Sequence, residues 1–393
     1  MLINLRNALM AGKRLPYDAE VEYLKSTGTQ YVALPPLPNP CTFEFEATFA
    51  QSSSAGTSAV LFGCKRGDVS ANNIMQFVPK YPLYDMCGAS PTRSSPSTTL
   101  PNDTFVTVSH KGGVFDFNGE KLSKTNTYST VNNYTAFGLF CAWSQTTGVF
   151  GEIYRCKLAN FKVWIDGILR YDYIPVRKGT VGYLYDRVSG KLFGNAGTGD
   201  FVLGPDVVPV EYIESHGTER ILTDIYTDAN TAINCKASGT SGSFFGVLPS
   251  SNTAWWTILP NDFGKLRYYY GGSGATDVAT IDATVPHDYQ CSSNVLVDGV
   301  EAISLSRTLG SANVPLSLFA RTASSGTSFT SLLVGRMWYL QIIQSGATVR
   351  SFRSVRVGTE GAMMDVLTRR VYRNAGTGAF GYGNDLKYPT PAS

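Results

Sequence analysis

Charged side chains are scarce in this chain of 393 residues, where they make up 16% of the total and leave a net charge of only +3. So small a positive charge does not favour a nucleic acid or an anionic membrane as a partner. No apolar run reaches the roughly 18 residues that a membrane-spanning helix requires. The chain is therefore expected to be globular, with neither nucleic acid nor membrane among its partners.

Histidine is also rare, with only His110, His216 and His287 in the whole sequence. The three are too few and too far apart in the chain to suggest a metal centre. Each is expected to be a surface or turn residue. Aromatic residues (12%) and glycine (39 residues) are plentiful by comparison, which is typical of a turn-rich, all-β protein.

The pentapeptide Asn-Ala-Gly-Thr-Gly occurs twice, beginning at Asn195 and at Asn374. An aromatic residue follows two positions after the last glycine of each copy, at Phe201 and Phe380. The same spacing of 179 positions aligns the upstream residues without a gap, back to the segments GLFCA and SLFAR. A match of this length indicates a tandem duplication.

The beginnings of the two copies also match, because VEYLKSTGTQ at 21–30 corresponds to VEYIESHGTE at 210–219. This spacing is 189, so the first copy carries an insertion in its front half. The resulting predicted organisation is an N-terminal segment at 1–18, a first domain at 19–204, a second domain at 205–383 and a tail at 384–393.

The seven cysteines are odd in number, contain no Cys-x-x-Cys pair and do not coincide between the two copies. A disulfide framework or a zinc site would have been duplicated together with its domain. We therefore expect free, buried thiols in a chain that folds in a reducing compartment. The N-terminal sequence has no continuous apolar core of the signal-peptide type, so export is not expected.

Strand patterns dominate the sequence. In CTFEFEATFA, the residues Phe43, Phe45, Ala47 and Phe49 alternate with polar ones, as in a half-buried strand. Two-residue hairpins are predicted where a pair that tolerates positive φ separates two apolar runs. These pairs are Asn118-Gly119, Asp166-Gly167 and Asp298-Gly299. Short strands and hairpins in units of about 180 residues favour a two-sheet antiparallel sandwich.

The repeated pentapeptide is interpreted as a tight bend in which Asn195, Gly197 and Gly199 take left-handed conformations. A phosphate-binding glycine loop is the alternative, but it would require a helix directly after it. The bend is therefore favoured over the phosphate site.

Several of these segments carry a resemblance to a known family. VEYLKSTGTQYV, the pairs Phe62-Gly63 and Phe245-Gly246, the LFCA/LFAR strand and the closing YDRVSGKLFGNAGTGDF are similar to concanavalin A-like, laminin-G-like jelly-roll modules. More narrowly, they resemble a version found in proteins of gut bacteria, their prophages and phages. The resemblance implies an all-β chain of two tandem jelly-roll sandwiches, with binding rather than catalysis as its function and with no cofactor.

Two sets of carboxylates are candidate sites. Glu44 and Glu46 share a strand face, as a glycosidase pair must, but a solvent-facing strand is favoured because polar residues face outward by default in such strands. Many laminin-G-like domains bind calcium, and the resemblance makes Asp224 and Asp228, with Asn230, the weak calcium candidates. Catalytic residues are not expected.

Aromatic residues are the remaining binding candidates. Successive rings in AWWTIL and LRYYYGG must alternate between the two faces of their strands, so some of them face outward. An outward ring can stack on a sugar or fill a subunit interface, whereas inward rings are core packing. The predicted ligand-binding residues are Trp255, Trp256, Tyr268 and Tyr270. Trp143, Trp164 and Trp338 are expected in the core.

The N-terminal segment places Leu2, Leu5 and Leu9 on one face of a short helix, which is expected to dock on a partner because it is too short to be stable alone. An anchoring segment followed by adhesive β-modules is the plan of many virion fibre and decoration proteins. The hypothesis is a phage virion protein, assembled as a homo-oligomer such as a trimer, that binds host or mucosal glycans. A bacterial surface glycan-binding protein and, less favoured, a glycoside hydrolase are the alternatives.

Overall fold

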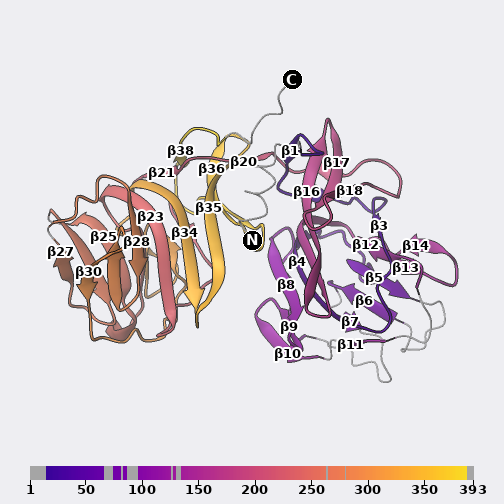
Figure 1. Ribbon diagram of the computed structural model, residues 1–393, viewed down its shortest axis with the longest axis horizontal. Helices are drawn as coiled ribbons and strands as arrows, with labels where there is room; N and C mark the ends of the chain where they lie inside the picture. Colours follow the sequence, from indigo (N-terminus) through magenta and orange to yellow (C-terminus); the bar gives the residue numbers. More distant parts are fainter. Residues whose placement is uncertain are drawn as a thin grey trace. The chain divides into compact units, whose positions relative to one another are not determined.

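The computed structural model describes residues 15–65, 74–80, 83–85, 96–124, 127–129, 134–262, 264–278 and 280–386. The chain divides into two compact units between Asp206 and Val207 (Figure 1). The described residues are almost entirely strands, turns and loops, and their one labelled helical turn is the 3-10 helix η2 (Asn252–Ala254). No helix among them is long and apolar enough to cross a membrane. Leu2, Leu5 and Leu9 lie outside the described residues.

Unit 1 is a sandwich of two largely antiparallel sheets. The first sheet has the order β10 (Glu120–Ser123), β9 (Val114–Phe117), β8 (Val106–Lys111), β4 (Cys41–Gln51), β15 (Cys156–Ile165), β16 (Ile168–Lys178), β17 (Val181–Asp186) and β18 (Lys191–Phe193). Short strands β1 (Ala19–Glu20), β2 (Leu24–Lys25), β11 (Thr127–Tyr128) and β19 (Val202–Leu203) add to it. The second sheet contains β14 (Val149–Gly151), β13 (Cys141–Ser144), β5 (Phe62–Lys65), β12 (Phe137–Leu139) and β3 (Val32–Leu34), with β6 (Ile74–Val78) and β7 (Leu83–Asp85) beyond β5.

Unit 2 repeats this strand order. Its first sheet runs β30 (Val300–Ser304), β29 (Asn294–Val297), β28 (His287–Cys291), β23 (Thr231–Ser241), β34 (Val334–Gln344), β35 (Ala347–Val357), β36 (Glu360–Asp365) and β37 (Val371–Tyr372), with β20 (Val207–Pro209), β21 (Ile213–His216) and β38 (Gly381–Tyr382) attached. Its second sheet runs β22 (Ile221–Leu222), β31 (Ser317–Leu318), β24 (Phe245–Leu248), β25 (Trp256–Asp262), β26 (Lys265–Tyr270) and β27 (Thr276–Val278), with β32 (Arg321–Ala323) and β33 (Phe329–Thr330) attached. Even the rare parallel pairs correspond, β13 with β5 and β32 with β24.

The core of each unit lies between its two sheets. In unit 1 the inward residues of β4 are fully buried, and the Phe45 ring contacts the Phe62 ring of the opposite sheet at 4.7 Å between centroids. In unit 2 the Phe245 ring packs against the Trp256 ring of the same sheet at 5.3 Å between centroids, and aliphatic residues of the first sheet, such as Ile233, complete the core. The predicted tandem antiparallel sandwich is therefore confirmed.

The three predicted hairpins are present. Asn118-Gly119, Asp166-Gly167 and Asp298-Gly299 each connect two paired strands, and all six residues have positive φ. Positive φ at both central positions is the geometry of the type I′ turn, which fits the right-handed twist of a hairpin.

The repeated pentapeptide joins the end of each unit to its beginning. The Asn195 carboxamide oxygen accepts hydrogen bonds from the amides of Tyr31 (3.0 Å) and Gly197 (2.9 Å). In unit 2, Asn374 accepts from Arg220 (3.0 Å) and Gly376 (2.7 Å). We call this arrangement the closing clasp of each unit.

Only one residue of the first clasp is left-handed, Gly199 with a φ of 69°, so the prediction for Asn195 and Gly197 is wrong. Gly197 is needed for space instead, because a Cβ there would overlap the carbonyl oxygen of Thr29. The aromatic residue after the clasp packs in the core on a left-handed phenylalanine. These ring pairs are Phe201 with Phe140 (5.1 Å) and Phe380 with Phe319 (4.8 Å).

The units extend slightly beyond the boundaries expected from the sequence. Arg177 binds Asp206 through two hydrogen bonds of 2.7 Å, and Arg356 binds Asp385 in the same way at 2.7 and 2.6 Å. Residues 205–206 therefore belong to unit 1, and residues 384–386 continue unit 2. Asp18 also joins unit 1, because its carboxylate accepts a hydrogen bond from the Gly179 amide at 2.7 Å.

The six described cysteines are free and buried, as expected. Burial raises the pKa of the Cys41 thiol to about 11 and that of Cys64 to about 12. The seventh, Cys87, lies outside the described residues. These thiols fill the core as small apolar side chains.

Three tryptophans predicted in the core are partly exposed. Trp164 lies between the inward-facing Val163 and Ile165, so strand alternation turns it to the outer face, where the Lys111 ammonium lies 4.1 Å from its ring centre. Trp143 packs against the core of unit 1 and the Phe150 ring at 4.7 Å, and Trp338 lies against the Tyr212 ring at 5.2 Å. Burial was expected because tryptophan side chains are large. The position of each residue in its strand leaves the ring partly exposed instead.

Candidate functional site

Three of the four aromatic residues predicted to bind ligand are in the core of unit 2. Trp256 and Tyr268 are 0% exposed and Tyr270 is 3% exposed. The Trp256 indole donates a hydrogen bond to the Tyr268 hydroxyl (2.8 Å), which in turn donates to the Ser292 carbonyl (2.5 Å). A ring with this environment cannot contact a surface ligand, so the prediction is corrected for Trp256, Tyr268 and Tyr270.

Trp255 and Tyr269 are the rings that face outward from these strands. Both are partly exposed, and their centroids lie 6.4 Å apart with the planes at 60°. The Trp255 indole donates a hydrogen bond to the Pro249 carbonyl at 3.1 Å, which fixes the orientation of its ring. Trp255 was predicted from the sequence, whereas Tyr269 was missed.

A signal for Tyr269 was nevertheless present in the sequence. In KLRYYY the charged residues Lys265 and Arg267 alternate with inward-facing Leu266, so the next residue on the polar face is Tyr269. The buried Tyr268 and Tyr270 continue the apolar face. Reading the alternation from the charged residues therefore separates the outer tyrosine from the two inner ones.

The residues around these two rings have small or polar side chains. Thr257, the cross-strand neighbour of Tyr269, is buried beside Gly246, where a Cβ would meet the side chains of Arg321 and Thr257. Further along the same face, Arg267 binds Asp277 through hydrogen bonds of 2.8 and 3.2 Å. We call this surface of β24, β25, β26 and β27 the Trp255–Tyr269 face. It combines two oriented rings with hydrogen-bonding groups.

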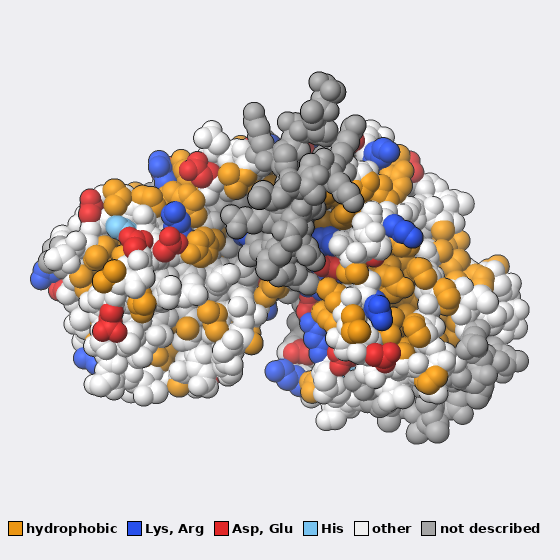
Figure 2. All heavy atoms as spheres, viewed as in Figure 1, with side chains coloured by type: hydrophobic (Ala, Val, Ile, Leu, Met, Phe, Trp, Pro, Cys, Tyr) orange, Lys and Arg blue, Asp and Glu red, His pale blue; other side chains and the backbone are white. Residues whose placement is uncertain are grey.

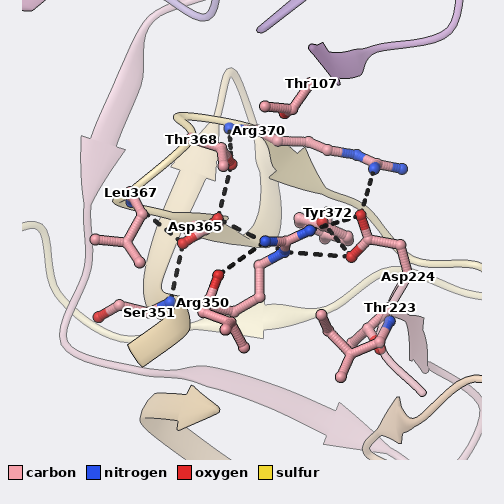
Figure 3. A network of polar contacts seen from close by, with 12 residues as sticks. Thr107, Thr223, Asp224, Arg350, Ser351, Asp365, Leu367, Thr368, Arg370 and Tyr372 are labelled. Atoms are coloured by element: carbon pink, nitrogen blue, oxygen red, sulfur yellow. Dashed lines mark hydrogen bonds and ion pairs between the residues drawn. The ribbon is translucent and has the colours of Figure 1, made fainter. Parts of the chain in front are cut away.

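Asp224, the first calcium candidate, is occupied by other interactions (Figure 3). Asp224 binds the guanidinium group of Arg350 at 3.2 and 2.8 Å, and also contacts Arg370 and the Tyr372 hydroxyl. Burial acts to raise the pKa of Asp224, but Arg350 and Arg370 hold it below its usual value. A divalent cation there would meet two positive charges.

Asp228 has a different structural role. Its carboxylate accepts hydrogen bonds from the Asn230 amide and the Thr231 hydroxyl, both at 2.9 Å, and so shapes the turn that leads into β23. No group of three or more histidine, cysteine or acidic residues within the described part of the chain could hold a metal ion. The structure thus does not bring Asp224 and Asp228 together as calcium ligands.

The glutamates considered for a hydrolase also have structural partners. Glu46 contacts the Lys162 and Lys111 ammonium groups at 2.8 and 2.9 Å. Burial acts to raise its pKa, but the two lysines hold it below the usual value. A catalytic acid requires a raised pKa. Glu44 accepts a hydrogen bond from the Gly112 amide at 2.7 Å. Glu46 therefore lacks the raised pKa of a catalytic acid, and both carboxylates have structural partners.

One histidine does not lie where it was expected. His110 is fully buried, with Nδ1 3.1 Å from the Tyr84 hydroxyl and Nε2 3.4 Å from the Lys124 carbonyl. Its position opposite inward-facing Phe45 in the sheet explains the burial. His216 is exposed, and His287 lies 2.6 Å from the Asp298 carboxylate.

Charged side chains are dispersed on the described surface in the view of Figure 2, where red and blue groups alternate with uncharged ones. The view contains no extended area of one sign among the described residues.

The comparisons with known proteins show likeness to solved structures only. No family model matches the chain, and no curated protein matches it. Among solved structures, the chain is similar to the mouse laminin alpha1 chain, domains LG4-5, with 11% sequence identity and a TM-score of 0.28 over 86% of this chain and 93% of that one.

Proposed function

We propose that this protein is a non-catalytic adhesion protein that binds glycans through the Trp255–Tyr269 face. The observation that carries the proposal is the pair of partly exposed rings, Trp255 directly before β25 and Tyr269 in β26, that lie 6.4 Å apart. Aromatic side chains supply a large contact area with little loss of conformational freedom, and the apolar face of a sugar ring is a suitable partner for them. The nearby Arg267–Asp277 pair offers hydrogen bonds to sugar hydroxyls.

The site is an open face rather than an enclosed pocket, so each copy is expected to bind weakly. Several copies displayed together would strengthen attachment, because the second binding event becomes intramolecular. An oligomer, such as a trimer, meets this need and is part of the proposal.

The virion setting is proposed from the sequence resemblance to modules of gut phages and prophages. In this proposal the chain is a capsid decoration, head-fibre or tail-fibre component, and residues 1–18 attach it to capsid or tail proteins. Cryo-electron microscopy of the phage particles would test it. Density for residues 1–18 buried against a capsid or tail subunit is the expected result, and absence of the chain from the particle would refute the virion setting.

Glycan binding is tested by screening the full chain on a glycan array and measuring the dissociation constants of the hits by calorimetry. Trp255→Ala and Tyr269→Ala are each expected to weaken binding at least tenfold. Tyr226→Ala is the matched control, because this tyrosine is 54% exposed and belongs to the connection between β22 and β23, outside the strands of the face. If no glycan binds, or if the two variants bind as tightly as the unsubstituted chain, the proposal fails.

The hydrolase alternative is tested in the same material. Incubation with β-glucans is expected to release no reducing ends. Turnover that disappears in Glu44→Gln or Glu46→Gln would establish the enzyme instead of the adhesion protein.

A further inference from the structure

Unit 1 contains an open cleft of about 480 Å³ between three loops. The side chains and backbone that matter here are Gly28, Ser54, Thr57, Ser58, Glu152 and Arg155. They come from the connection between β2 and β3, the connection between β4 and β5, and the segment between β14 and β15. We call this the Arg155 cleft.

Arg155 gives the cleft a positive charge that the fold itself does not use. Its guanidinium group makes no hydrogen bond or ion pair with any residue in the described part of the chain, and the side chain is exposed. Gly28, at φ 111°, leaves room for it, because a Cβ at that position would lie 2.7 Å from Arg155 Nε. The guanidinium is therefore placed by local packing while its donors stay available.

Hydroxyl groups and one carboxylate complete the lining. Thr57 and Ser58 are exposed beside the cleft, and Ser54 shares a hydrogen bond of 3.0 Å with Ser52. Glu152 forms an ion pair with Lys65 at the cleft edge. This set can donate to a carboxylate and can exchange hydrogen bonds with several ligand hydroxyls.

The loop that carries the three hydroxyls is held in place before any ligand arrives. The Lys80 ammonium donates to the carbonyls of Ser53 (2.8 Å) and Ala55 (2.7 Å). The Val60 amide donates to the Glu152 carbonyl at 2.8 Å, and Ala55 and Ala59 are buried in the core. A pre-ordered loop loses little conformational freedom on binding.

Unit 2 shares two backbone features of this region without the same chemistry. Glu152 has a left-handed φ of 55°, and the equivalent residue, Ser331, has one of 48°. Val334 takes the position of Arg155, and Gly217 approaches Val334 as Gly28 approaches Arg155. The loop between β4 and β5 covers residues 52–61, whereas its counterpart between β23 and β24 covers only 242–244. The fold therefore needs neither the arginine, the glutamate nor the long loop.

We propose that the Arg155 cleft binds the carboxylate of an acidic sugar residue, such as a hexuronate. Arg155 would hold the carboxylate through paired hydrogen bonds, the geometry in which guanidinium groups bind such groups best. Thr57, Ser58 and Glu152 would contact the ring hydroxyls. The cleft lies in unit 1 and uses no residue of the Trp255–Tyr269 face, so it does not depend on the function proposed for that face.

Ligand-observed NMR titrations of the full chain with D-glucuronate test the proposal, and D-glucose is the neutral match. The expected results are saturable binding of glucuronate, at least tenfold weaker binding of glucose, and at least a tenfold loss of glucuronate affinity in Arg155→Val. Arg155→Lys keeps the charge but loses the paired geometry, so it is expected to be intermediate. Because Val334 occupies the equivalent position in unit 2, Arg155→Val should keep the thermal midpoint unchanged.

Three outcomes would overturn the proposal. These are no saturable glucuronate binding, equal affinity for glucose, and glucuronate binding that Arg155→Val leaves unchanged. Displacement of glucuronate by a hexaglutamate peptide at comparable concentration would overturn the sugar class. Trp255→Ala should bind glucuronate normally, so a failure of either proposal can be recognised separately.

Discussion

The outer faces of the two second sheets show how far equivalent parts of the units have diverged. In unit 1, Gly63, Gln76 and Asp85 are neighbours across β5, β6 and β7, and Gln76 donates a hydrogen bond to Asp85 at 3.1 Å. In unit 2, Gly246 and Tyr269 flank Thr257 at the matching places. The glycine is common to both, while the other residues change from an amide and a carboxylate to a hydroxyl and a ring. The framework is shared and the outward surface is specific to each unit.

The residues common to both units are those with a backbone function. The clasp asparagines, the left-handed phenylalanines and the buried Asp186 and Asp365 make the same contacts in each unit. Clefts and aromatic faces differ because outward side chains can change without disturbing these contacts. Substitutions at equivalent positions can therefore separate residues needed for folding from residues available for binding.

The largest effect is expected from the clasp glycines. A Cβ on Gly197 or Gly376 would overlap the carbonyl oxygen of Thr29 or Thr218. Gly197→Ala and Gly376→Ala should each lower the free energy of unfolding of their own unit by about 3 kcal/mol. Hydrogen exchange followed by mass spectrometry resolves the two units. Gly151→Ala is the control, because nothing lies within 4 Å of its Cβ. Equal stability of Gly197→Ala and Gly151→Ala would contradict this role of the clasp.

The buried aspartates should come next. Asp186 accepts hydrogen bonds from the amides of Asp172 (2.9 Å) and Val188 (3.1 Å), and Asp365 accepts from Ser351 (2.9 Å) and Leu367 (3.2 Å). Alanine at either position leaves buried amides without an acceptor, at a cost of about 2 kcal/mol. Chemical denaturation of both variants measures this loss in the free energy of unfolding. A loss in one unit only would show that the two turns are not equivalent.

A pH effect is expected in unit 1 alone. Burial lowers the pKa of His110, and the groups near it are the Tyr84 hydroxyl, Lys124 and Glu44. The unfolded chain binds a proton at the ordinary histidine pKa near 6.5, while folded His110 stays neutral. The stability it contributes is thus complete above that value and is lost as pH falls toward the lower folded pKa.

The equivalent residue in unit 2 is Cys291, so His110→Gln should reduce the pH dependence of hydrogen exchange in unit 1 between pH 7 and pH 5 and leave unit 2 unchanged. Exchange in unit 1 that keeps its full pH dependence after this substitution would assign the effect to other groups.

The smallest effect is expected at Glu152. Ser331 has the same left-handed backbone conformation in unit 2. Glu152→Ser should therefore change the free energy of unfolding of unit 1, measured by thermal denaturation, by less than about 0.5 kcal/mol. It removes only a surface ion pair with Lys65. A large loss of stability would mean that Glu152 serves the fold rather than the Arg155 cleft.

Much of the architecture could be predicted from the sequence because it depends on local patterns. Strand alternation in CTFEFEATFA, the three hairpin pairs and the duplicated segments all describe backbone geometry that neighbouring residues determine. The partners of the clasp asparagines could not be predicted, because Asn195 and Tyr31 are 164 residues apart in the sequence.

The candidate sites were harder to predict, because they depend on which face of a strand a residue occupies. Two adjacent tryptophans carry no information on which one is inward, and the choice is made by pairing between β25 and β26. The Arg155 cleft has no local signature either. Its residues come from three loops that are distant in sequence, so only the insertion in the first copy hinted that unit 1 had an additional feature.

The closing clasp has a consequence for how such proteins can be assembled. The clasp and the Val21–Asp206 bridge hold the first and last residues of unit 1 next to each other. The polypeptide chain therefore enters and leaves the domain at the same place on its surface. A domain of this kind can be copied in series, or inserted into a loop of another protein, with little change to the host. The contacts that close one sandwich therefore also allow its coding sequence to be duplicated or moved into another gene as a unit.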